Sequence, residues 1–229
     1  KLHRDGRIFL CCLGDFNNGC IMTLQPDGSA PQVLLSGYVA DDMVFDAQGG
    51  FYFTHFVGSV FDPKGGVYYV APGDDRAQPV LANMAGPNGI ALSTSGKSLW
   101  VTETNANRLH LIDLGDTPTT IAPHGTCVAH TFTGYHGPDS CSIDAHDNLY
   151  VAMYEQGRVM VFDRQGVPVA QVVMPGREQG QLLRTTHPMI APGTSDLSIC
   201  TNDHTGERGS WILRARALAE APLHFHTRP

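Results

Sequence analysis

The stretch that decides the fold is QGGFYF, residues 48–53, in which a glycine-rich turn leads directly into a short apolar strand. The same combination of a turn and an apolar strand returns about every fifty residues. The other four copies are residues 5–10 (DGRIFL), 95–101 (SGKSLWV), 146–151 (HDNLYV) and 194–199 (TSDLSI). A fixed period of this length indicates a repeat architecture, in which each copy contributes one structural unit.

A second apolar strand, introduced by glycine or asparagine, follows each copy. These second strands lie at residues 19–22, 65–70, 107–111, 157–162 and 209–213. Two apolar strands joined by a turn are typical of a β-hairpin. Most copies are also preceded by an apolar strand such as residues 88–92, and several are followed by another, which gives about four strands per repeat.

Short antiparallel strands at this spacing predict an all-β propeller, whose blades are four-stranded antiparallel sheets around a central channel. A β-sandwich with coincidental spacing is the alternative, but five aligned copies favour the propeller. Only residues 214–221 have a composition that favours a helix. Residues 1–3 are interpreted as the end of an inner strand, so we expect residues 1–229 to be a single β-propeller domain that is incomplete at its N-terminus.

The composition argues against several partners. The formal net charge is −7 with only 15 lysines and arginines, so a basic stripe for nucleic acid is lacking. No apolar run approaches the roughly 20 residues that cross a bilayer, and the first residues do not resemble a signal peptide. The six cysteines lack CxxC spacing, which favours reduced thiols. We therefore expect a cytoplasmic protein that contacts neither nucleic acid nor membrane.

Polar residues recur at one fixed place in the repeat, five residues before positions 46, 93, 144 and 192. The residues at this place are Asp41, Asn88, Asp139 and His187. Each is expected to start the first strand of its blade, which lines the channel, so these side chains should form a ring at one mouth of it. Carboxylates that face one another in a partly enclosed channel repel, and a bound cation relieves that repulsion.

The ring predicts a site for a hard cation. Asp41, Asn88 and Asp139, together with the adjacent Ser140, present oxygen atoms. Oxygen ligands suit calcium better than zinc. The alternative is that these residues only form turns, as Asp and Asn commonly do. Asp46 and Asp144, which follow the first strands, are interpreted as turn formers of that kind.

Several motifs together resemble one known family. These motifs are residues 41–46 (DDMVFD), 87–93 (PNGIALS), 99–104 (LWVTET), 137–141 (GPDSC) and 149–154 (LYVAMY). In order and spacing they resemble the gluconolactonase and senescence-marker-protein family, most closely its bacterial drug-responsive lactonases. The resemblance implies a six-bladed β-propeller with a calcium ion in its channel and lactone-hydrolysing activity.

The resemblance also implies a set of ligands. Asp41, Asn88 and Asp139 match three metal ligands of the family, and Ser140 matches a neighbour implicated in the lactonase branch. The family's glutamate ligand has no counterpart in this sequence, so we expect the first blade, or more, to be absent from it. A second calcium ion, as in the lactonase branch, cannot be assigned to particular residues.

These observations predict a calcium-dependent lactonase that acts on a small-molecule lactone, although another hard divalent cation could replace calcium. Asp139 is the candidate for transferring a proton between the attacking water and the leaving alkoxide. His187, Tyr154 and His55 are candidate substrate contacts; for each, a solvated or structural role is the alternative. No GxSxG motif is present, which argues against a serine esterase. The alternative function is a non-catalytic, calcium-stabilised propeller that acts as a binding scaffold or regulator.

Overall fold

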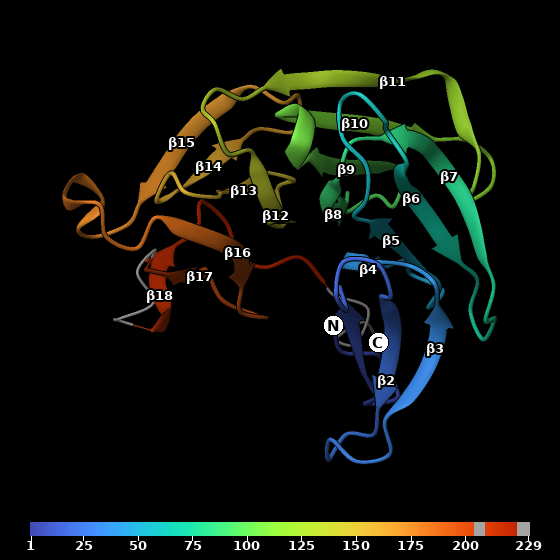
Figure 1. Cartoon of the computed structure of the whole chain (residues 1–229). Helices are drawn as coiled ribbons and strands as arrows, with labels where there is room; N and C mark the ends of the chain where they lie inside the picture. The colour runs from blue at the N-terminus through green and yellow to red at the C-terminus, as the bar shows by residue number, and fades with distance from the viewer. Residues whose placement is uncertain (204–208, 224–229) are drawn as a thin grey trace.

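The computed structural model describes residues 1–203 and 209–223, which fold as an all-β propeller. Five antiparallel sheets follow one another around a common centre in chain order (Figure 1). In the second to fifth sheets the first strand of each sheet lies innermost, and these inner strands pack against one another in turn. The architecture predicted from the repeat is therefore confirmed at the level of the propeller.

The strands of each blade are as follows. The first blade contains β1 (Ile8–Cys12), β2 (Cys20–Leu24) and β3 (Gln32–Ser36). The second contains β4 (Ala40–Phe45), β5 (Phe51–His55), β6 (Gly65–Val70) and β7 (Ala77–Met84). The third contains β8 (Pro87–Leu92), β9 (Ser98–Glu103), β10 (Arg108–Leu114) and β11 (Ile121–Thr131). The fourth contains β12 (Pro138–Ile143), β13 (Leu149–Met153), β14 (Arg158–Phe162) and β15 (Pro168–Val173). The fifth contains β16 (Arg184–Ile190), β17 (Asp196–Asn202) and β18 (Ser210–Arg216).

The described residues meet two expectations about the blades only in part. Four strands are present in only three blades, because the first and the last sheets have three strands each within the described residues. In the first blade the innermost place is held by residues 1–3, where Leu2 forms one isolated bridge with Ile8. A single bridge is too short a ladder to make a strand. The described residues form five blades, so the prediction of six is not confirmed by them.

The core lies between neighbouring blades. Successive side chains of a strand point to opposite faces of its sheet. On β5, Phe53 therefore packs with Phe9 of the first blade, whereas Tyr52 packs with Leu99 of the third. Each blade consequently needs a neighbour on both of its faces to bury its apolar side chains.

The turns after the inner strands are built on carboxylates. Asp46 Oδ1 accepts hydrogen bonds from the backbone N–H groups of residues 48–50 at 2.8 to 2.9 Å, and its Oδ2 accepts one from the Tyr69 hydroxyl at 2.7 Å. Asp144 repeats the arrangement, with the Tyr150 hydroxyl at 3.0 Å. The prediction that Asp46 and Asp144 form turns is confirmed.

The helix-favouring composition of residues 214–221 does not produce a helix. Residues up to Arg216 belong to β18, which pairs along the whole length of β17. After the strand, the Ala217 N–H donates to the Ser195 carbonyl and the Ala221 N–H to the Thr194 carbonyl, both at 2.9 Å. Pairing with an existing strand therefore outweighs the local helix propensity of this segment.

Helical structure within residues 1–203 and 209–223 is limited to two short 3₁₀ turns, η1 (Thr104–Ala106) and η2 (Arg177–Gln179). No helix in this part of the chain is long and apolar enough to span a membrane. The six cysteines are free thiols.

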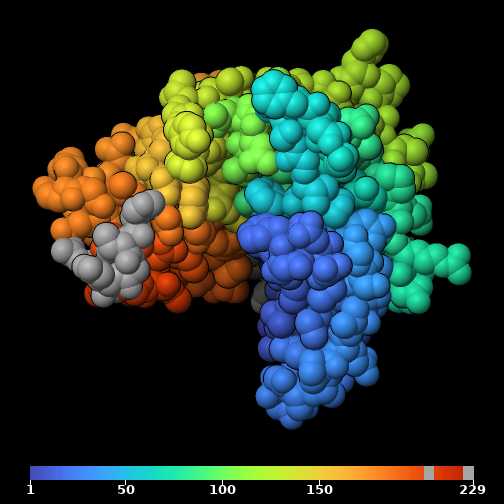
Figure 2. Space-filling model, in the orientation of Figure 1, coloured from blue at the N-terminus to red at the C-terminus, as the bar shows by residue number. Residues whose placement is uncertain are grey.

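One side of the propeller is open. In Figure 2 the first blade (blue) and the last blade (orange to red) stand apart, with a hollow between them. Phe9 and Ile199 point into the core, so their strand neighbours Leu10 and Cys200 face the other way. Leu10 is 38% exposed, and Ile212, which pairs with Cys200, is 74% exposed. Both end blades thus present apolar side chains on a face without a neighbour among the described residues.

Candidate functional site

The inner strands share one irregularity at the same place. In β4, β8 and β12 the pairing with the second strand is interrupted, and two inner-strand residues stand opposite one residue of the partner. The bulged pairs are residues 41–42, 88–89 and 139–140. A β-bulge re-aims the side chains of the bulged strand. Each bulge contains one of the predicted ring residues.

The bulges bring predicted ligands of three consecutive blades together. The Asn88 side chain lies close enough to the Asp139 carboxylate to lower its pKa, and Asn88 Oδ1 accepts a hydrogen bond from Ser140 Oγ at 3.4 Å. The Ser140 N–H donates to Asp139 Oδ1 at 2.8 Å. Asp41 lies close enough to Asp139 for the two carboxylates to repel. Asp41, Asn88, Asp139 and Ser140 therefore form one cluster, as the sequence predicted for the ring.

The cluster is short of positive charge. Burial, followed by the negative charges of Asp139 and Asp42, raises the pKa of Asp41 well above its usual value. Burial also raises the pKa of Asp139 to about 7, with Asp42 adding to the effect, although hydrogen bonds from Ser140 and Asn88 oppose it. Two carboxylates that resist ionisation at one place favour the binding of a proton or a cation.

The ring position in the fifth blade was predicted one residue too late. In β16 the pairing is interrupted between Thr185 and His187, and Pro188 pairs with Ile199 as Met43 pairs with Phe53 in the second blade. The equivalent of Asp41 is therefore Thr186, not His187, which occupies the following position, as Asp42 and Ser140 do. Burial lowers the pKa of His187 to about 4, so its imidazole is neutral at pH 7.

The sequence comparison of the repeats missed Asp42. Its side chain is buried, and Oδ2 has no hydrogen-bond partner. Its Oδ1 accepts a hydrogen bond from the Met43 N–H at 2.8 Å and lies 3.3 Å from Lys1 Nζ. The two consecutive aspartates were visible in the sequence, but alternation along a regular strand places them on opposite faces. The bulge at residues 41–42 breaks this alternation, and both carboxylates lie close enough to Asp139 to interact with it electrostatically.

Gly89 is a second residue whose role was not predicted. A Cβ atom at this position would lie 2.6 Å from the Cys141 backbone nitrogen and 2.7 Å from Ser140 Cα. Strands β8 and β12 therefore approach so closely that only glycine fits between them. This contact sets the spacing between Asn88 and Ser140. The Asn-Gly pair inside an apolar strand was the available signal, because glycine within a strand often marks a bulge or a close approach.

His55 lies at the same end of the second blade as Asp41, but it packs away from the cluster. Its Nδ1 accepts a hydrogen bond from the Val39 N–H at 3.0 Å. Its ring contacts those of Tyr38 and Tyr68, with centroids 5.4 and 6.1 Å away. These contacts hold the chain where it enters β4, just before Asp41.

Tyr154 lies beside the mouth of the channel, directly after β13. Its ring contacts the imidazole of His136 at 5.8 Å, and the guanidinium of Arg184 lies over it at 5.8 Å. Glu155 joins both neighbours, with its carboxylate 3.0 Å from His136 and 3.2 Å from Arg184. Met153, the residue before Tyr154, pairs with Pro138, so this aromatic and charged cluster flanks the start of the strand that carries Asp139.

Comparison with known proteins identifies the family. Residues 33–182 match the model of the SMP-30/Gluconolactonase/LRE-like region, a range that includes β4 to β15 and the bulges of β4, β8 and β12. The chain belongs to this family.

Relatives within the SMP-30/gluconolactonase family agree with this assignment. The protein called Lactonase drp35 of Staphylococcus saprophyticus is 54% identical over 99% of this chain and 72% of its own length. Among solved structures, a luciferin-regenerating enzyme has a TM-score of 0.71 at 16% identity, covering 94% of this chain and 80% of its own. A calcium-binding protein, regucalcin, from Agrobacterium tumefaciens has a TM-score of 0.68 at 18% identity, covering 93% and 77%. At these identities, the two structures show a shared fold.

The residues of this SMP-30/gluconolactonase chain fit a hard cation in part. The described residues contain no group of three or more His, Cys, Asp and Glu side chains that could hold a metal. The cluster instead offers two carboxylates, an amide and a hydroxyl, all oxygen donors, and the unpaired Asp42 Oδ2 lies in the next position. Calcium takes about 6 to 8 oxygen ligands. The donor chemistry therefore suits calcium, and the donor number leaves room for water or substrate.

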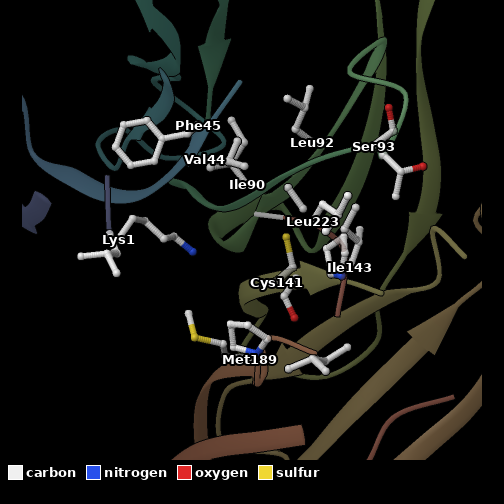
Figure 3. A pocket seen from close by; sticks show the side chains of 17 residues that line it. Lys1, Val44, Phe45, Ile90, Leu92, Ser93, Cys141, Ile143, Met189 and Leu223 are labelled. Atoms are coloured by element: carbon white, nitrogen blue, oxygen red, sulfur yellow. The ribbon is translucent and has the colours of Figure 1, made fainter. Parts of the chain in front are cut away.

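A separate cavity of about 320 Å³ is lined by the later halves of the inner strands β4, β8, β12 and β16 (Figure 3). Its lining is mostly apolar and includes Phe45, Leu92, Ile143 and Met189, with Leu223 from the C-terminal segment. An apolar lining offers little to stabilise charge that develops in a hydrolytic reaction. The chemistry of this SMP-30/gluconolactonase member is therefore expected at the bulges and not in the cavity.

Proposed function

We propose that this chain is a calcium-dependent lactonase, a carboxylic ester hydrolase that opens the ring of a small-molecule lactone at the channel mouth. The observation that carries the proposal is the cluster of Asp41, Asn88, Asp139 and Ser140 on three consecutive inner strands. Its oxygen donors suit a hard cation, with calcium the first choice. The 54% identity to a protein named as a lactonase supports hydrolysis of a lactone as the reaction.

Within this proposal the cluster has two tasks, holding the ion and transferring a proton. A bound calcium ion would supply a Lewis acid for the lactone carbonyl and stabilise negative charge on its oxygen. Asp41, Asn88 and Asp139 would hold the ion, with Ser140 completing the set. The Asp139 carboxylate accepts a proton from the attacking water and returns it to the leaving alkoxide, which is general base and then general acid catalysis. The Ser140 N–H, 2.8 Å from Asp139 Oδ1, keeps that carboxylate in place.

Three further residues complete the proposed site. Tyr154 beside the mouth and the neutral imidazole of His187 are the proposed substrate contacts. His55 also stands among the predicted contacts, but its hydrogen bond with the Val39 N–H supports a role in fixing the approach to Asp41. The free thiols are compatible with a reducing compartment such as the cytoplasm.

We also propose that the ring closes with a sixth blade. The unpartnered apolar faces of the first and last blades and the hollow between them support this arrangement (Figure 2). The SMP-30/gluconolactonase relative from S. saprophyticus extends beyond the matched region, which covers 72% of its length. A sixth blade would be the place for a further carboxylate ligand.

The test is hydrolysis of a small aromatic lactone by the purified protein, encoded with any adjoining upstream residues, in calcium and after chelation. We expect chelation to abolish turnover and added calcium to restore it. Asp139→Asn should lower kcat/KM at least about 100-fold, because general acid–base catalysis contributes about 10² to 10⁴. Asp113→Asn, on an exposed carboxylate of β10, is the control and should keep full activity.

The same measurements separate the alternative function. Calcium-dependent melting without turnover of any lactone would favour the scaffold or regulator and reject the enzyme. Turnover that survives complete chelation would reject the role of the metal.

A further inference from the structure

Thr54 stands opposite the first bulge. It lies on β5 between His55, which pairs with Ala40, and Phe53, which pairs with Met43, so its hydroxyl faces the bulged residues 41–42. The side chain is fully buried. Its Oγ1 accepts a hydrogen bond from the Asp42 N–H at 3.2 Å and donates one to the Asn88 carbonyl at 2.5 Å. One hydroxyl therefore links the bulge of the second blade to the ring residue of the third.

Thr102 repeats this arrangement one blade further along. It lies on β9 opposite the bulge at residues 88–89 and is also fully buried. Its Oγ1 accepts a hydrogen bond from the Gly89 N–H at 2.7 Å and donates one to the Asp139 carbonyl at 2.7 Å. The backbones that carry Asp41, Asn88 and Asp139 are thus joined in series by two hydroxyl groups.

The two hydroxyls satisfy backbone groups that the bulges leave without ladder partners. A bulge disrupts the local hydrogen-bond ladder, and a buried unpaired N–H or C=O group is costly. A hydroxyl can donate one hydrogen bond and accept others at the same time. Threonine at this place therefore fixes both the bulge of its own blade and the distance to the next inner strand.

The same position in the other blades supports a link to the cluster. The fourth blade has Ala152 opposite the bulge at residues 139–140, and the next inner strand then carries Thr186 at the ring position. The fifth blade has Cys200 at the corresponding place. Among the described blades with a bulged inner strand, a threonine hydroxyl therefore stands opposite the bulge only in two. In both, the ring residue of that blade and the ring residue of the next blade are predicted ligands. If it served strand packing alone, its restriction to these two blades would have no explanation.

We propose that Thr54 and Thr102 are positioning residues that set the spacing of Asp41, Asn88 and Asp139 for a hard divalent cation. This inference rests on the proposed metal site and deepens it. Both threonine hydroxyls form their hydrogen bonds with backbone atoms and not with the side chains that would hold the cation. They therefore act through the backbone of the residues that carry the ligands.

The test measures calcium affinity by titration calorimetry and the calcium-induced rise in Tm, in the full gene product. Thr54→Val and Thr102→Val keep the shape of the side chain and remove the hydroxyl. We expect each to weaken calcium binding about 10- to 100-fold, the usual effect of removing a partner that orients a ligand. Thr54→Ser and Thr102→Ser retain the hydroxyl and should restore most of the affinity.

Thr201→Val is the matched control. Thr201 is also a buried threonine on a second strand, and its hydroxyl donates to the Leu182 carbonyl at 2.9 Å, away from the cluster. This variant should lower the Tm of the calcium-free protein and leave the calcium affinity unchanged.

Two different results would reject the positioning role and the metal site, and they can be told apart. If wild-type protein binds calcium and the valine variants at positions 54 and 102 bind it equally well, the positioning role is rejected and the metal site stands. If wild-type protein binds no divalent cation, the metal site itself is rejected, and the positioning role is rejected with it.

Discussion

Gly89 illustrates how one residue sets the spacing between two blades. Its missing Cβ allows β8 to approach the backbone of Ser140 and Cys141, and the same bulge carries Asn88. The Gly89 N–H is also the donor to Thr102. A change at this position therefore affects strand packing and the candidate cluster together.

We predict that Gly89→Ala lowers both stability and calcium affinity. The new methyl group would meet backbone atoms at 2.6 to 2.8 Å, so the two inner strands have to separate. Overpacking of this kind costs about 1 to 3 kcal/mol. Urea unfolding and calcium titration measure the two effects. Gly28→Ala is the control: its φ of +80° strains the alanine and lowers stability, but the site is open and distant, so calcium affinity should be unchanged. An unchanged calcium affinity would contradict the spacing role of Gly89.

At the scale of single residues, the sequence predicts part of the cluster. Asp41, Asn88 and Asp139 emerge because each precedes its turn by the same five residues. Thr186 does not emerge, because the fifth blade has no aspartate or serine that marks its turn: Ala191 takes the place of Asp46, and Thr194 supplies the side-chain hydrogen bonds. Counting five residues back from Pro192 instead of Ala191 selects His187.

At the scale of strands and turns, the repeat is the reliable signal. A turn followed by alternating apolar residues predicts each hairpin, because both features are local. The bulges depend on contacts between the inner strand, its partner strand and the next blade, so spacing along the chain does not reveal them. The threonines opposite the bulges were not singled out for the same reason.

Glu103 at the end of β9 is an element-scale contact that responds to pH. Its Oε1 accepts a hydrogen bond from the Ala85 N–H at 2.6 Å, and its Oε2 lies 2.7 Å from His110 Nε2. Burial alone opposes ionisation, but these hydrogen bonds and the nearby Arg108 hold the pKa of Glu103 below its usual 4.5. The carboxylate thereby ties the segment before β8 to β9 and β10.

The sign of the pH effect follows from this lowered pKa. The folded state favours ionised Glu103, so its contribution to the free energy of unfolding is present above pH 4.5 and is lost as the pH falls through the folded-state pKa. We predict that Glu103→Gln costs about 2 kcal/mol at pH 7, as expected for hydrogen bonds to a buried charge, and less at pH 3. Urea unfolding at both pH values, with exposed Glu178→Gln as the control, measures the difference. An equal cost at both pH values would reject the assignment.

At the scale of the whole molecule, the core between blades explains why the two end faces matter. Every internal blade buries side chains on both faces, whereas Leu10 on β1 and Ile212 on β18 remain exposed at the open side. Periodicity along the sequence predicts each blade but not how many blades close the ring, because closure depends on the angle between neighbouring sheets. The proposed sixth blade would therefore cover the exposed faces of the first and last blades.

Ile212→Asp tests directly whether a sixth blade covers β18. In the 229-residue chain Ile212 is 74% exposed, so aspartate should cost no more than about 1 kcal/mol, the span of exposed strand propensities. In a longer gene product whose sixth blade covers β18, the same change buries an unpaired carboxylate and should cost about 3 kcal/mol or more. Val169→Asp on β15, half exposed on an outermost strand, is the control and should cost the same in both proteins. Thermal and urea unfolding of the two proteins measure the difference, and an equally small cost of Ile212→Asp in both would show that no blade covers this face.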